Sequence, residues 1–69
     1  MKRFVIGFLD YSDGMVRLEI VEGNSKREVL YNFMTTSLGY VFDDPNISIE
    51  DMQIEACNGD LSMSIPIEI

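Results

Sequence analysis

The sequence predicts an α+β fold with the element order ββαββ, in which one helix packs on one face of a four-stranded, mainly antiparallel sheet. Apolar and polar residues alternate with the period of a strand near both ends of the chain, and apolar residues with helical spacing lie between them. Turn-forming residues separate these segments. With 69 residues, the chain predicts one domain over 1–69, which buries about 60% of the surface that its unfolded form exposes.

The first two segments predict a β-hairpin. Residues 3–9 carry apolar side chains on both faces, which is typical of a strand near the middle of a sheet. A turn over 11–14 follows, in which Gly14 is free to adopt a positive φ. In the next strand apolar and charged side chains alternate. We therefore expect the apolar side chains to face the core and the charged ones to face solvent. The apolar set is Val16, Leu18 and Ile20, and the charged set is Arg17 and Glu19.

A helix is predicted to begin after Ser25 and to end near Gly39. Ser25 and Glu28 have the spacing of a capping box, in which each side chain satisfies a free backbone N–H at a helix start. Gly39 can adopt the left-handed conformation that often ends a helix. The apolar stripe that should lie on the sheet consists of Val29, Leu30, Phe33, Met34 and Leu38.

The second half of the chain predicts an acidic loop and then a second hairpin. We expect residues 40–51 to form the loop, with one helical turn before Asp51 after a start signal at Ser48. Alternation over 52–57, the pair Asn58-Gly59 and alternation over 61–69 predict the hairpin. Pro66 cannot donate to a strand ladder, so the last strand is predicted to be an edge. With the first strand central, the strand order is 2-1-3-4 or 2-1-4-3.

Charge is distributed very unevenly along this chain. The net charge is −7, from 12 acidic and 5 basic residues, and every basic residue lies within the first 27 positions. The remaining residues carry eight acids and no base. Nucleic-acid binding requires basic residues that displace counterions from phosphates, so direct binding to nucleic acid or to an anionic membrane is not expected. The charge distribution instead predicts a protein partner with a basic surface.

The residue types predict no enzyme, no cofactor and no metal. Histidine is absent, which removes the usual general base and zinc ligand, and no glycine-rich phosphate loop is present. Oxygen-bearing residues from Asp44 to Glu55 have the spacing of a calcium-binding loop, but Ile49 stands where that loop needs glycine. We therefore interpret the segment as a solvated acidic loop. An enzyme based on carboxylates remains the least favoured alternative.

Cysteine content and hydropathy predict a cytoplasmic protein. Cys57 is the only cysteine, so no internal disulfide can form. The apolar run at the N-terminus stops at Asp10, which makes it too short for a membrane span, and no small-residue cleavage site follows.

Three candidate binding surfaces follow from these patterns. The leading hypothesis is a protein-binding module, an inhibitor or modulator that docks on a basic or nucleic-acid-binding protein. Its predicted contact residues are Asp43, Asp44, Glu50, Asp51, Glu55 and Asp60. The alternative is a small structural or oligomerising subunit that pairs through an exposed sheet edge, the strand over 61–69. An apolar strip on the open sheet face, predicted to comprise Val5, Leu9, Val21 and Cys57, would favour association with itself or with a target.

The general build of the chain resembles a known class of proteins. It starts Met-Lys-Arg-Phe-Val-Ile, continues with a predicted ββα opening, lacks a catalytic constellation and ends in an acid-rich remainder. In these respects it resembles the small accessory proteins of bacteriophages, among them anti-CRISPR and other anti-defence inhibitors and antitoxin-like proteins. The resemblance implies a protein that binds and blocks a host protein in the host cytoplasm. It carries over no functional residue, because it rests on no specific motif.

Overall fold

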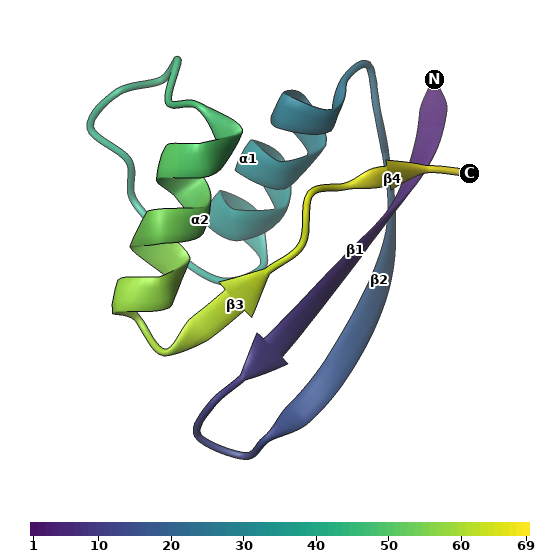
Figure 1. Cartoon of the computed structure of the whole chain (residues 1–69). Coiled ribbons are helices and arrows are strands. Elements are labelled where there is room, and N and C mark those ends of the chain that lie inside the picture. Colours follow the sequence, from purple (N-terminus) through teal and green to yellow (C-terminus); the bar gives the residue numbers. More distant parts are fainter.

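The computed structural model describes residues 1–69 as a sheet with two helices on one side of it (Figure 1). The predicted α+β class and the four-stranded antiparallel sheet are confirmed. The predicted ββαββ order with a single helix is wrong, because the order is ββααββ. The elements are β1 (Lys2–Asp10), β2 (Met15–Gly23), α1 (Lys26–Thr36), α2 (Ile49–Asn58), β3 (Leu61–Met63) and β4 (Ile67–Glu68).

Strand β1 is the centre of the sheet, as its two apolar faces predict. On one side it pairs antiparallel with β2 along the full length of both strands. On the other side it pairs with both β3 and β4, which follow one another along the same edge. Neither predicted strand order describes this arrangement, because β3 and β4 do not pair with each other. The last strand does lie at an edge, as Pro66 indicates.

A single serine bridges the gap between β3 and β4. The N–H of Gly7 donates to the Oγ of Ser64 at 2.9 Å, and the N–H of Ser64 donates to the carbonyl oxygen of Gly7 at 2.8 Å. The register slips by one residue here, since Phe8 lies opposite Met63 while Val5 lies opposite Ile67. This bulge accommodates the buried Pro66, which has no N–H to offer β1.

Helix α1 begins and ends as the capping residues predict. The N–H of Glu28 donates to the Oγ of Ser25 at 3.2 Å, and the Glu28 carboxylate accepts the N–H of Asn24 at 2.7 Å. The helix ends at Thr36 with Ser37 as its C-cap, and Gly39, whose φ is +77°, follows two residues after this cap, near the predicted end. All of the buried residues of α1 belong to the predicted stripe: Val29, Leu30, Phe33 and Met34.

Helix α2 replaces the predicted strand over 52–57. Ser48 caps it, with its Oγ accepting the N–H of Asp51 at 3.1 Å, and Glu50 and Asp51 place negative charge in its first turn, where the helix dipole favours it. Met52 and Ala56, four residues apart, are the two buried side chains. The predicted second hairpin is therefore wrong, and Gly59 ends the helix by donating its N–H to the carbonyls of Ala56 and Glu55.

The hydrophobic core lies between the helices and one face of β1. Its main members are Ile6, Phe8, Leu30, Phe33, Met34, Met52, Ala56 and Met63. Phe8 and Phe33 bring their ring centroids to 5.6 Å, so α1 and the sheet meet through an aromatic pair. Of the four methionines after Met1, three are buried, and Met15 is exposed.

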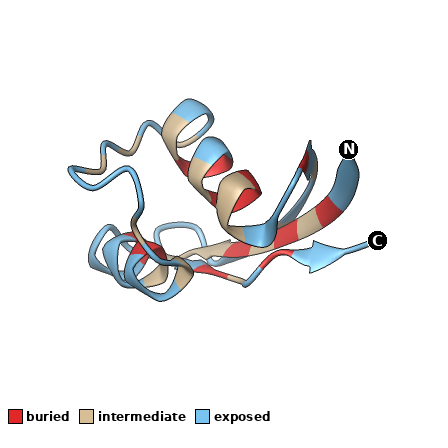
Figure 2. Ribbon diagram, turned by 90° about the horizontal axis from the view of Figure 1, so that it is seen from above, coloured by how far each residue is buried: buried red, intermediate tan, exposed pale blue.

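The opposite face of the sheet carries no helix (Figure 2). We expected Val16, Leu18 and Ile20 to face the core, and this prediction is wrong, because all three are more than half exposed. Cross-strand partners share a face, and Arg17 and Glu19 lie opposite Phe8 and Ile6, which point toward the helices. The pairing register set by the turn over 11–14 thus gives β2 an apolar face toward solvent.

Candidate protein-binding surface

The long loop between α1 and α2 is held by the side chain of Arg27. Its Nε donates to the carbonyl oxygen of Ile47 at 2.7 Å, and its guanidinium also bonds the carbonyl of Pro45. The same guanidinium lies 5.4 Å from the ring centroid of Tyr31. The backbone of the acidic loop is therefore fixed to α1 by a basic side chain, and the loop carboxylates form no ion pair.

Aromatic side chains pack together in the first half of this loop and against α1. Phe42 lies 5.7 Å from Tyr31 and 5.9 Å from Tyr40 between ring centroids. Further along, the Asp44 carboxylate accepts the N–H of Asn46 at 2.8 Å, which closes a local turn. These contacts give the loop a defined shape although most of its residues are exposed.

Four of the six predicted contact residues surround one hollow between this loop and α2. The hollow has a volume of about 330 Å³. Its acidic members are Asp43, Asp44, Asp51 and Glu55, and its apolar members are Val41, Phe42, Ile47 and Ile54. Residues from the loop and from two successive turns of α2 meet here because α2 is a helix. With Asp51 at the end of the predicted loop and Glu55 in the predicted strand over 52–57, extended backbone would have separated the two carboxylates by a longer distance.

None of these carboxylates is paired with a basic side chain. The protein contains one ion pair, between Arg17 and Asp13 at the β1–β2 turn. The acidic hollow therefore presents uncompensated negative charge, which attracts cations and basic surfaces in solution.

The remaining two predicted residues lie outside this hollow. Glu50 is exposed in the first turn of α2 but does not line it. Asp60 lines a second, more open hollow of about 560 Å³ together with Asp10 and Tyr40. Asp60 also adopts a positive φ of 66° just after α2, and its carbonyl accepts the N–H of Tyr11 at 3.0 Å, so its backbone has a structural role.

The phenol of Tyr40, which lines the second hollow, has an altered acidity. Burial raises the pKa of its phenol above the usual value, and the carboxylates of Glu55 and Asp60 raise it further. Each of these effects disfavours a phenolate, so Tyr40 remains a neutral hydrogen-bonding group near neutral pH. It does not have the lowered pKa of an activated nucleophile.

Sequence reasoning missed the apolar part of the hollow. Val41 is 88% exposed and Ile54 is 52% exposed, and both stand beside carboxylates. The strand interpretation placed Ile54 on the same face as Met52 and Ala56, whereas in a helix it lies about half a turn away from them. Recognising the helix from the Ser48 cap would have revealed an exposed isoleucine.

The predicted apolar strip on the open sheet face is half right. Val5 and Leu9 do face away from the helices, opposite Ile20 and Val16 of β2. Val21 lies on the other face, because it pairs with the buried Phe4, and Cys57 is exposed on α2 as a free thiol. The open face instead gains its apolar character from β2 and from Ile67 of β4, which is also exposed.

Nowhere in the structure do three acidic or cysteine side chains gather in a way that could hold a metal ion. Ser48, within the stretch with calcium-loop spacing, uses its hydroxyl as a helix cap. No helix has the length and apolar character that crossing a membrane requires. Comparisons with known protein families, with curated proteins and with solved structures give no match.

Proposed function

We propose that this chain is a non-enzymatic protein-binding module that docks on a basic protein surface through the acidic hollow between α2 and the preceding loop. The observation that carries this proposal is the juxtaposition of four unpaired carboxylates with exposed Val41 and Ile54. Charged residues around an apolar centre speed association with a partner of opposite charge, and the apolar centre slows dissociation once water is excluded.

The partner we propose is a protein whose basic groove normally holds nucleic acid. Such a groove carries closely spaced lysine and arginine side chains that meet phosphates, and carboxylates on a rigid support can occupy the same positions. Arg27 supplies the rigidity, because it fixes the loop backbone without neutralising the side chains. Little ordering entropy then opposes binding.

In biological terms we propose an inhibitor or modulator of the kind that the bacteriophage accessory proteins represent. The cytoplasm is the compartment we propose, and it would be the host cytoplasm for a phage-encoded chain. A thiol that is exposed and free, such as that of Cys57, is suited to a reducing compartment.

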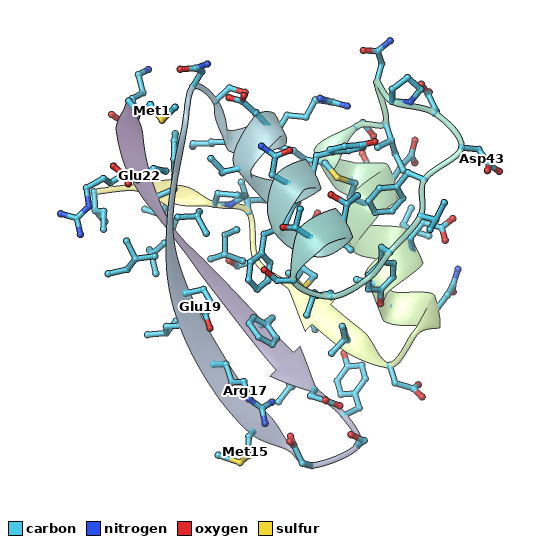
Figure 3. All side chains as sticks on the ribbon, turned by 180° about the vertical axis from the view of Figure 1, so that it is seen from behind. Met1, Met15, Arg17, Glu19, Glu22 and Asp43 are labelled. Carbon is cyan, nitrogen blue, oxygen red and sulfur yellow. The ribbon has the colours of Figure 1, made fainter.

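The test compares two variants with equal change in charge. D43N/E55Q neutralises two carboxylates of the hollow, and neither side chain forms a hydrogen bond or an ion pair within the chain. E22Q/E68Q neutralises two exposed carboxylates on β2 and β4. Figure 3 shows Asp43 on the loop, on the opposite side of the molecule from Glu22.

Each protein is used to capture partners from extracts of its native host, and the affinity for the captured partner is then measured by titration. We expect D43N/E55Q to bind about tenfold more weakly and E22Q/E68Q to bind nearly as tightly as the wild type. Affinity should also fall with salt, since the screening length shortens from about 10 Å at 0.1 M to about 3 Å at 1 M. Equal affinity of the two variants, or affinity insensitive to salt, would contradict the proposal.

A further inference from the structure

Strand β2 forms a long, unpaired edge of the sheet. Its nine residues pair only with β1, and the other edge is divided between the short strands β3 and β4. Soluble proteins usually protect such an edge with proline, with a bulge or with charged side chains, lysine above all. The charged side chains of β2 are Arg17, Glu19 and Glu22, which carry both signs. Strand β2 contains neither proline nor lysine, and it pairs with β1 in continuous register without a bulge.

The backbone groups that β2 offers at this edge can be identified. Gly7 uses its N–H and its carbonyl on Ser64, on the side of β1 away from β2. Leu18 lies directly opposite Gly7, so in the antiparallel ladder its own N–H and carbonyl point the other way, out of the free edge. The same holds for every second residue, which includes Val16 and Ile20.

The side chains of β2 are self-complementary in one register. When two copies of the strand run antiparallel around a two-fold axis at Leu18, Arg17 of each copy lies opposite Glu19 of the other. Both ion pairs fall on the helix side of the sheet, where Figure 3 shows Arg17 and Glu19 along β2. On the open face, Val16 then meets Ile20 of the other copy, and the two Leu18 side chains meet each other.

The neighbouring registers lack this match. Moving the axis to Arg17 puts the two arginines opposite each other, and moving it to Glu19 does the same for the two glutamates. Like charges directly opposite each other destabilise a strand pair. The registers at Arg17 and Glu19 also pair outward-pointing residues with one another, as the hydrogen bonds between two antiparallel strands require, so the charge match is what selects the register at Leu18.

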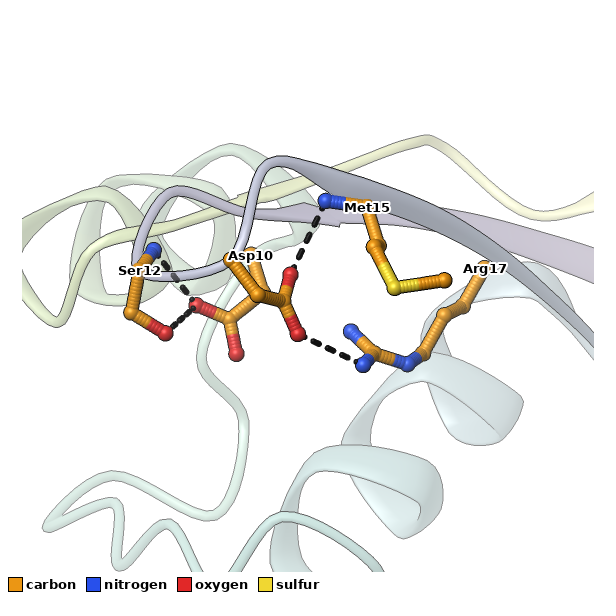
Figure 4. A network of polar contacts seen from close by, with 5 residues as sticks. Asp10, Ser12, Met15 and Arg17 are labelled. Atoms are coloured by element: carbon orange, nitrogen blue, oxygen red, sulfur yellow. Dashed lines mark hydrogen bonds and ion pairs between the residues drawn. The ribbon is translucent and has the colours of Figure 1, made fainter.

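The charged groups are available for these contacts. Glu19 has no basic partner within its own chain, because the only ion pair joins Arg17 and Asp13 at 2.7 Å (Figure 4). Arg17 uses one of its terminal nitrogens for Asp13, and its guanidinium has further N–H donors. About 40% of its side chain is exposed.

We propose that this protein forms a homodimer through antiparallel pairing of β2 with the β2 of a second copy, in the register centred on Leu18. Two four-stranded sheets then become one eight-stranded sheet with the helices of both copies on the same side. The acidic hollows lie away from the two-fold axis, on the loop side of each copy, so the dimer presents two of them.

Charge reversal with rescue tests the proposal. R17E and E19R each place like charges opposite each other in the dimer, and the double variant R17E/E19R restores two ion pairs with their signs exchanged. Sedimentation equilibrium of the full chain measures the dimer dissociation constant. We expect each single variant to raise it about tenfold or more and the double variant to bring it back close to the wild-type value.

Circular dichroism checks that each variant is folded, which matters for R17E because Asp13 loses its partner. The E19R variant keeps the Arg17–Asp13 pair and therefore provides the cleaner single substitution. A wild-type protein that stays monomeric at about 1 mM, a concentration at which even weak complexes form, would overturn the proposal. So would a dimer that all three variants form equally well, because it would then be held by the open face and not by the edge.

Discussion

The Nε of Arg27 on α1 lies 2.7 Å from the carbonyl oxygen of Ile47, twenty residues further along the chain. This bond, with the second one to Pro45, ties the loop that carries Asp43 and Asp44 to the body of the protein. The basic side chain contacts backbone oxygens, so the loop is ordered by a positive charge while its own negative charges remain exposed.

Replacing Arg27 by alanine should loosen this loop. Hydrogen bonds to a charged donor contribute about 1.5–3 kcal/mol, and we expect R27A to lower the free energy of unfolding by about 2 kcal/mol in urea titrations. The amide of Ile47, which donates to Asp44 at 3.2 Å, should exchange its hydrogen faster. Lys26→Ala is the matched control, since Lys26 is exposed and makes no ion pair. Equal stability of the two variants would contradict the role of Arg27.

Removing the cap of α2 should destabilise the protein through the helix that holds half of the acidic hollow. Ser48→Ala deprives the N–H of Asp51 of its acceptor, and such a loss costs about 1 kcal/mol. Ser62→Ala, at an exposed position of β3, makes the same chemical change outside a cap. Unfolding in urea should separate the two by about 1 kcal/mol, and the helical circular dichroism of S48A should weaken. A variant as stable as S62A would show that the cap is dispensable.

Gly23 closes β2 against the first turn of α1. A Cβ at this position would lie 2.5 Å from the Cγ1 of Val29, which is too close for two carbon atoms in non-bonded contact. Gly23→Ala should therefore lower the free energy of unfolding by about 1–3 kcal/mol, as overpacking of a core commonly does.

A double-mutant cycle identifies the cause of that loss. In a Val29→Ala background the Cγ1 atom is gone, so G23A should cost clearly less than in the wild type. The measurement is again unfolding in urea, with all four proteins compared under the same conditions. An equal cost in both backgrounds would mean that the backbone of residue 23, and not contact with Val29, sets the requirement for glycine.

The phenol of Tyr40 makes stability depend on pH at the alkaline end. Its pKa is higher in the folded protein than in the unfolded chain, mainly because of burial. The contribution is therefore complete below the unfolded pKa, about 10, and is lost as the pH rises through the folded value. Ultraviolet titration should show one tyrosinate signal at a pH above 10 that Tyr40→Phe removes. A Y40F protein with the same high-pH step as the wild type would contradict this assignment.

Half of the fold followed from local signals that tertiary contacts did not override. The turn at Gly14, the capping box of Ser25 and Glu28 and the both-sided apolar pattern of β1 each specify one structure. The segment over 52–57 was ambiguous, because Met52 and Ala56 share a face in a strand and also in a helix. The Ser48 cap, together with Glu50 and Asp51, favours the helix, but these residues precede the segment over 52–57 in which apolar and polar residues alternate.

The orientation of β2 was not accessible from its own residues. Its apolar set looked like a core face, yet the hairpin register places Arg17 opposite Phe8 and so turns Leu18 outward. A strand at the edge of a small sheet reaches beyond the area that two short helices cover, so packing does not enforce the usual orientation. For the acidic hollow, the sequence indicated the carboxylates but not Val41 and Ile54, which only the helical form of α2 brings to them.

The central position of β1 also has a consequence during synthesis on the ribosome. Residues near the start of the chain, such as Phe4 and Val5, find their partners on one side only when Glu68 and Ile67 have been made. Until then the backbone groups on that side of β1 have no strand partner, and the nascent β1–β2 hairpin has a second exposed edge. A nascent-chain complex stalled before residue 67 should consequently recruit chaperones, and removal of the final few residues should release an aggregation-prone hairpin rather than a shortened native protein.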